Sequence, residues 1–207
     1  FFPAALAMAV FPVLSKKDNQ EFQQTITFGF QLALFISLPT LGGLFILAKD
    51  IISFIFGSNY ANAYPGLQLI SFAIPFNFLL LILVDALIAL DKRKELLVYD
   101  LVVLVLNFGL NLLFVPQFSY FASSAITSIS SFLSLIFAYW ILKKYAPISL
   151  KEVKIFNYLL STILMMILIY ILPIHLILKV IIGALFYFLC LFILKDPLFA
   201  KLKKFEL

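Results

Sequence analysis

Long apolar stretches, separated by short polar segments, run along most of the chain. Six of them approach the roughly 20 residues that an α-helix needs to cross the hydrocarbon core of a bilayer. They cover residues 26–48, 66–90, 96–115, 121–142, 155–174 and 176–194. We interpret a shorter apolar stretch at 1–14 as the end of a truncated transmembrane helix of a longer protein. The pattern predicts an all-α, polytopic transmembrane helix bundle.

The span at 96–115 carries a polar stripe. Asp100, Asn107 and Asn111 are seven and four residues apart, so at about 100° per residue they share one helix face. Because unpaired polar groups are costly in hydrocarbon, this face should meet another protein surface or water. The same argument for the neighbouring spans gives these candidates for cavity-lining or inter-helix contacts: Gln31, Gln68, Ser71, Asn107, Asn111, Ser124, Thr127 and Ser131.

Two interpretations stay open for the hydroxyl-rich span at 121–142. Small polar side chains allow helices to pack closely and can donate a hydrogen bond to the carbonyl four residues earlier. They can also line a hydrated cavity. The spans at 155–174 and 176–194 have few polar residues. We therefore expect these two spans to be peripheral and exposed to lipid.

Helix-breaking residues predict local irregularities. Pro39 with the pair Gly42 and Gly43 should bend the first complete span, and Pro75 should bend the second. Between these spans, residues 51–57 are predicted to form a short interfacial helix that ends at Gly57.

The composition and the charge pattern agree with a membrane protein. Hydrophobic residues make up 64% of the chain and charged residues 12%, and the mean hydropathy is +1.14; soluble domains have roughly 25% charged residues. Thirteen of the fifteen Lys and Arg residues fall in every second polar segment. By the positive-inside rule these segments and the C-terminus face the cytoplasm. The net charge of +5 is then a topology signal, and no nucleic-acid partner is expected.

Two carboxylates could couple transport to an ion. Asp85 and Asp100 flank the charged turn at 91–95, so both should lie at similar depth near the cytoplasmic face. In one hypothesis they form part of a cation or proton site, with a proton or sodium as the coupling ion. In the other, Asp100 stabilises the N-terminus of its helix, and Asp85 pairs with Lys92 or Arg93 at the membrane interface.

Residues suited to catalysis or metal binding are scarce. The chain has one Cys and one His, which excludes a Cys/His zinc cluster within it, and it offers no Ser-His-Asp arrangement or Gly-rich phosphate loop. Cys190 lies in an apolar run, where packing is the favoured interpretation, and His175 lies in a tight turn. We therefore expect no enzymatic activity, no catalytic residues, no cofactor and no metal.

Short motifs follow one another in order between about residues 10 and 135. The first motif, FPVLSK at 11–16, closes a span. Pro39 is followed by AKDII at 48–52 and by IFG at 55–57. The later motifs are Tyr60, Ala63 and Leu67, and then Asn107-x3-Asn111-x4-Pro116. With these motifs the chain resembles the C-terminal half of the bacterial polysaccharide and O-antigen flippases, within the multidrug/oligosaccharidyl-lipid/polysaccharide exporter superfamily. Where that family usually has Gly-x-x-Gly-Ala-Ala, this chain has Ser119, Ala122, Ser123 and Ser124, so the turn loses the conformational freedom of glycine.

The resemblance implies one lobe of a two-lobe transporter. Residues 26–142 would form a C-terminal transport lobe of four complete transmembrane helices, 155–194 two additional peripheral helices, and 195–207 a cytoplasmic tail. The function implied is alternating-access flipping of a polyprenyl-diphosphate-linked oligosaccharide, such as an O-antigen repeat unit, across the bacterial inner membrane. Its partners would be this lipid-linked substrate and membrane lipids, and the last two helices would help to form a lipid-side groove.

Two other functions stay open. One is a multidrug or lipid-linked peptidoglycan-precursor exporter of the same superfamily. The other is a membrane-embedded glycosyltransferase or polymerase, which the short loops disfavour because they lack a catalytic constellation.

Overall fold

The described part of the chain is built from helices. The computed structural model describes residues 19–146, 148–150 and 152–199. In chain order its elements are α2 (Asn19–Phe56), the 3₁₀ helix η1 (Ser58–Ala63), α3 (Tyr64–Ser71), α4 (Ala73–Ala89), α5 (Arg93–Lys143), α6 (Ile155–Ile171) and α7 (Leu176–Ile193). The predicted all-α class is confirmed. The truncated helix predicted at 1–14 and residues 200–207 of the predicted tail lie outside the described residues.

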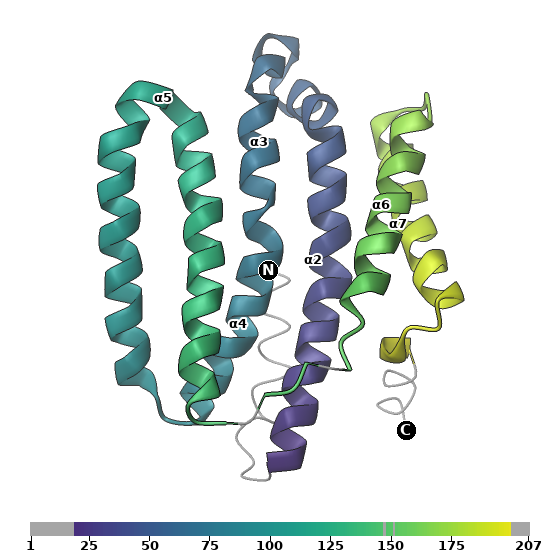
Figure 1. Cartoon of the computed structure of the whole chain (residues 1–207). Helices are drawn as coiled ribbons and strands as arrows, with labels where there is room; N and C mark the ends of the chain where they lie inside the picture. The colour runs from purple at the N-terminus through teal and green to yellow at the C-terminus, as the bar shows by residue number, and fades with distance from the viewer. Residues whose placement is uncertain (1–18, 147, 151, 200–207) are drawn as a thin grey trace.

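The helix α5 is a hairpin of two antiparallel arms (Figure 1). The backbone is non-helical at Ser119, where φ is 56° and ψ is −145°, and the chain reverses direction there. We call residues 93–118 the first arm and residues 120–143 the second arm. The two arms contain the predicted spans at 96–115 and 121–142.

The helix α2 lies in the middle of the bundle. Figure 1 shows the α5 hairpin on one side, α3 and α4 next to it, then α2, and finally α6 and α7 on the other side. α2 contacts α3, α4, α6 and α7, and α4 contacts α5. Buried apolar side chains fill the contact between α2 and α4, including Ile26, Phe30, Ile82 and Leu83. α2 therefore joins the α3–α5 part to the α6–α7 hairpin.

Helix breakers act differently at the two predicted bends. α2 continues through Pro39 and on to Phe56, so residues 51–56 form its last turns, and the prediction of a separate helix there is wrong. The helix ends before Gly57, whose φ of 91° favours glycine. In the second span, the helix is interrupted at Phe72, between α3 and α4. Pro75 explains this break, because it has no N–H to donate to the carbonyl of Ser71.

The two ends of the bundle differ in charge. The α4–α5 turn, the segment between α5 and α6 and the end of α7 lie at one end, and the bend of α5 and the turn between α6 and α7 lie at the other (Figure 1). Within the described residues, the first end carries Lys92, Arg93, Lys94, Lys143, Lys144, Lys154 and Lys195. The other end has Lys49 and Lys179. The fold thus gathers the basic segments that the sequence places on one side of the membrane.

Replacing Ser119 with glycine should stabilise the protein. A non-glycine residue in this backbone region costs about 1–3 kcal/mol, and the side chain of Ser119 is exposed. We expect Ser119→Gly to raise the free energy of unfolding by about 1 kcal/mol, measured by thermal unfolding in detergent. Ser123→Gly is the control, since Ser123 lies inside the second arm, where glycine should lower stability. A loss of stability in Ser119→Gly would contradict the assigned conformation.

A buried carboxylate fastens the α6–α7 hairpin. Asp196 follows α7 and is 2% exposed. Its Oδ1 accepts hydrogen bonds from the Tyr158 hydroxyl at 2.8 Å and from the Leu198 amide at 3.1 Å, and its Oδ2 accepts one from Asn157 Nδ2 at 3.2 Å. Since Asn157 and Tyr158 lie in the first turn of α6, this cluster ties the start of α6 to the end of α7.

Removing the Asp196 carboxylate should loosen this hairpin. Asp196→Ala leaves the buried Tyr158 hydroxyl without its acceptor, and we expect a loss of about 3 kcal/mol in the free energy of unfolding. Asp196→Asn keeps one acceptor oxygen and should lose less. Hydrogen exchange of α6 and α7 would locate the effect. Equal stability of Asp196→Ala and the unaltered protein would contradict this role.

Candidate functional site

Several candidate polar residues join neighbouring helices. Gln68 Nε2 in α3 donates to the Phe45 carbonyl of α2 at 2.9 Å. Ser128 in the second arm of α5 donates to the Leu69 carbonyl of α3 at 2.6 Å. Ser124, on the same arm, lies beside Gly66, since a Cβ on that glycine would be 3.5 Å from its Oγ. The hydroxyl-rich arm is therefore packed against α3 along this stretch.

The polar stripe joins the two arms of α5 through Asn107, and Asn111 bonds to Asn107 on the same arm. Asn107 Nδ2 donates to Ser130 Oγ at 3.0 Å, and Asn111 Nδ2 donates to the Asn107 carbonyl and to its side-chain oxygen at 2.8 and 3.0 Å. Asn111 also lines a cavity of about 390 Å³ between the arms, together with Pro116 and Ser123. Asn107 thus makes the inter-helix contact, and Asn111 has access to the cavity.

The remaining candidates bond to backbone carbonyl groups or are buried within the bundle. Ser71 Oγ donates to the Gln68 carbonyl, and Thr127 Oγ1 to the Ser123 carbonyl. Ser131 is buried in the second arm. Gln31 is fully buried and its Nε2 donates to the Glu152 carbonyl at 3.2 Å, so it holds the segment before α6.

The two candidate carboxylates lie in different environments. Asp85 in α4 is 9% exposed, and its Oδ2 is buried with no hydrogen-bond partner among the described residues. Neither Lys92 nor Arg93 forms an ion pair with it, and Lys92 Nζ lies 4.1 Å from the centre of the Tyr145 ring. Asp100 is exposed. Both lie near the α4–α5 turn, as expected, but only Asp85 is a buried group in need of a partner.

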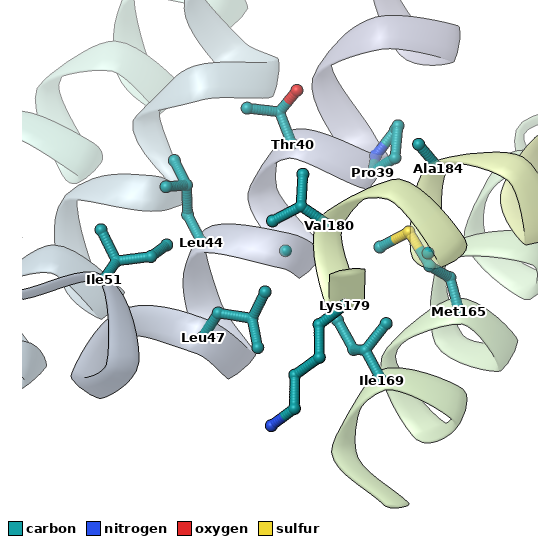
Figure 2. A pocket seen from close by; sticks show the side chains of 12 residues that line it. Pro39, Thr40, Leu44, Leu47, Ile51, Met165, Ile169, Lys179, Val180 and Ala184 are labelled. Carbon is teal, nitrogen blue, oxygen red and sulfur yellow. The ribbon is translucent and has the colours of Figure 1, made fainter. Parts of the chain in front are cut away.

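An apolar groove opens between α2, α6 and α7 (Figure 2). Its volume is about 320 Å³, at the lower end of the range for ligand sites. Aliphatic side chains of all three helices surround it, with Lys179 at the edge. Its lining residues are Pro39, Thr40, Gly43, Leu44, Leu47, Ile51, Met165, Ile169, Lys179, Val180, Gly183 and Ala184.

Glycines shape this groove in two ways. A Cβ on Gly42 would come within 2.8 Å of Thr162 Cγ2 in α6, and a Cβ on Gly183 within 2.9 Å of Ile169 Cγ2. These two glycines allow the three helices to approach closely. A Cβ on Gly43 would meet nothing within 4 Å. Gly43 therefore leaves the groove open, and the predicted bend residues Pro39 and Gly43 both line its wall.

Sequence patterns missed one part of this site. Lys179 Nζ lies 3.5 Å from Asp50 Oδ2, an ion pair between α7 and α2. The residues are 129 positions apart, so no periodicity in the sequence links them. The charge pattern was the available signal, because it places Lys49 with Asp50 and Lys179 on the same side of the membrane.

These features define the class of protein: an all-α, multi-pass membrane bundle with polar contacts between its helices and an apolar groove on its side. The family described as "Lipid II flippase MurJ" matches residues 1–194. The chain therefore belongs to the MurJ lipid II flippase family, which is a family of transporters and not of enzymes.

Individual relatives agree with this family. The probable lipid II flippase MurJ of Vibrio cholerae serotype O1 is 26% identical over 148 residues, which cover 67% of this chain and 28% of the relative. A solved lipid II flippase MurJ in an inward closed conformation has a TM-score of 0.82 at 19% identity, over 96% of this chain and 44% of that one. The chain thus spans less than half the length of these proteins.

The comparisons change the functional prediction in one respect. The resemblance to flippases of the multidrug/oligosaccharidyl-lipid/polysaccharide exporter superfamily holds, since MurJ belongs to it. Within that superfamily, the family match supports the alternative, an exporter of a lipid-linked peptidoglycan precursor, better than the leading prediction of a polysaccharide or O-antigen flippase.

Proposed function

We propose that this chain is the C-terminal part of a flippase that moves lipid II, a lipid-linked peptidoglycan precursor, across the bacterial inner membrane by alternating access. The family match over residues 1–194 is the observation that carries the proposal. Because the chain spans less than half of the relatives, the proposal concerns the activity of the whole protein. Residues 26–142 supply a transport lobe, and 155–194 supply two peripheral helices.

The groove between α2, α6 and α7 has the properties of a site for the lipid tail. It is lined mainly by aliphatic side chains, and exposed residues such as Thr40 and Val180 leave it accessible from outside the bundle. Because a lipid tail would enter this groove from the bilayer and not from water, packing contacts with these side chains would hold it there. The tail would follow this groove while the polar head crosses the cavity of the full-length transporter.

The basic end of the bundle faces the cytoplasm in this proposal. Seven Lys and Arg residues of the described part lie there, against two at the opposite end, as the positive-inside rule requires. The C-terminus then lies in the cytoplasm, and Lys179 lies on the outer side.

Asp85 is the favoured group for ion coupling. A buried carboxylate oxygen without a hydrogen-bond partner among the described residues can take up a proton or a cation, which removes the cost of burying its charge. Asp100 is exposed and does not share this property. Asn107 supports the contact between the α5 arms, and Asn111 lines the adjoining cavity.

The direct test follows lipid II in cells that depend on the full-length protein. Depletion should reduce the lipid II that is accessible to a membrane-impermeant probe at the outer face, and renewed expression should restore it. Lipid-linked O-antigen units serve as the comparison and should cross the membrane unchanged. Unchanged outer-face lipid II after depletion would contradict the proposal, and a defect confined to lipid-linked O-antigen would favour a polysaccharide flippase.

A further inference from the structure

The only cationic side chain that lines the apolar groove lies at one end of it, within the part that the structure describes. Figure 2 shows the Lys179 side chain extending to the end of the groove opposite Pro39 and Thr40. Its stem contributes to the groove wall, and its ammonium group lies 3.5 Å from Asp50 Oδ2. The side chain of Lys179 is 17% exposed and that of Asp50 is 51% exposed. A ligand chain in the groove would therefore have a cation at its outer end.

The ion pair with Asp50 is loose enough to exchange. Charge-assisted hydrogen bonds from an ammonium to a carboxylate are usually about 2.7–2.9 Å long, and this one is 3.5 Å. Solvent and salt weaken ion pairs with an exposed partner. An ammonium has three N–H donors, and Asp50 is the one acceptor that the described residues provide for it. Lys179 can thus bind an anionic group beside Asp50 or in place of it.

The shape of the groove indicates which anion would reach Lys179. Pro39 and Ile51 lie at its two ends on α2, and at 1.5 Å per residue their separation is about 18 Å. This is more than half of the roughly 30 Å hydrocarbon core, so the groove follows the direction of a lipid chain from the bilayer interior to its surface. Its small volume suits one chain more than the two chains of a phospholipid.

We propose that Lys179 binds the diphosphate of a polyprenyl lipid whose chain occupies this groove, and that Asp50 competes with the diphosphate for the ammonium. This inference rests on the proposed function for the identity of the lipid. Lys179 lies on the side opposite the basic end, so it contacts the diphosphate on the outer side of the membrane. Asp50 then recaptures Lys179 when the lipid leaves, which favours release on that side.

A purely structural ion pair predicts a different result for Asp50. If the pair only fastens α7 to α2, Asp50→Asn and Lys179→Gln should both lower stability and should act alike on binding. If Asp50 competes with the ligand, the two substitutions act in opposite directions. Lys179→Gln weakens binding of the diphosphate, and Asp50→Asn strengthens it.

The test measures binding to the purified full-length protein in detergent, with geranylgeranyl diphosphate as the probe and geranylgeraniol as its uncharged counterpart. Lys179→Gln should weaken diphosphate binding about tenfold and leave binding of the alcohol unchanged. Asp50→Asn should tighten diphosphate binding about threefold. Lys49→Gln is the matched control, because Lys49 is exposed at the same end and does not line the groove.

Three results would overturn the proposal. One is equal weakening by Lys179→Gln and Lys49→Gln, and another is weaker diphosphate binding in Asp50→Asn. The third is equal competition by phosphatidylglycerol, which would assign the site to an anionic phospholipid. Since binding is measured without transport, a protein that binds the probe as expected but moves no lipid II would contradict the proposed function alone.

Discussion

Filling the groove at Gly43 should abolish most of the lipid II transport. Gly43→Leu projects a four-carbon side chain into space where a Cβ meets no atom within 4 Å, so it occupies the groove without displacing α6 or α7. The added side chain excludes part of the lipid tail and removes its packing contacts with the groove wall. We expect a loss of transport of about tenfold, which corresponds to about 1.4 kcal/mol. The measurement is the rate at which lipid II reaches the outer face in cells carrying the full-length variant.

Gly109→Leu is the matched control for this substitution. A Cβ on Gly109 also meets nothing within 4 Å, but Gly109 lies on the first arm of α5, away from the groove lining. Both variants replace glycine by a better helix former, so neither should lose stability. Transport by Gly43→Leu at the level of Gly109→Leu would show that the tail does not use the groove.

Neutralising Asp85 should raise the stability of the protein and lower its ion-driven transport. Asp85→Asn removes a buried charge that has no ion-pair partner among the described residues. We expect the free energy of unfolding to rise by about 1 kcal/mol, because burying an uncompensated charge is costly. Transport driven by an ion gradient should fall at least about tenfold, which corresponds to about 1.4 kcal/mol of lost coupling. Proteoliposomes with imposed proton or sodium gradients would measure it.

Asp100→Asn tests whether this effect is specific to the buried group. Asp100 lies near the same end of the bundle but is exposed, so its loss should change transport by less than about twofold. If both variants keep the ion dependence of the unaltered protein, neither carboxylate couples transport to an ion. If Asp85→Asn unfolds the protein, Asp85 serves as a structural acceptor.

Periodicity and hydropathy predicted the helical class and the approximate spans, because a segment in a bilayer must satisfy its backbone hydrogen bonds internally. The same reasoning predicted that the Asn107 and Asn111 face needs partners, and the structure places it against Ser130 and a cavity. The sequence could not predict that α2 continues as a helix through Pro39, since packing against neighbouring helices decides whether a proline interrupts a helix.

Single residues show where local rules were informative and where they were not. The loss of a glycine at Ser119 was visible in the sequence as a departure from the motif of the resembled family, and the structure shows a backbone conformation there that favours glycine. The different environments of Asp85 and Asp100 were not visible. Both sit in apolar sequence at similar distances from one turn, and only the packing of α4 within the bundle buries Asp85.

The sequence by itself determined that this chain crosses a membrane several times, which segments are basic, and which faces carry polar groups. These properties depend on local composition and on the 3.6-residue helix period. The tertiary structure decided which polar groups meet, that Asp85 is buried, and that α2, α6 and α7 enclose a groove with Lys179 at its end. Some of these contacts join residues more than a hundred positions apart, such as Lys179 and Asp50, and all depend on how whole helices pack.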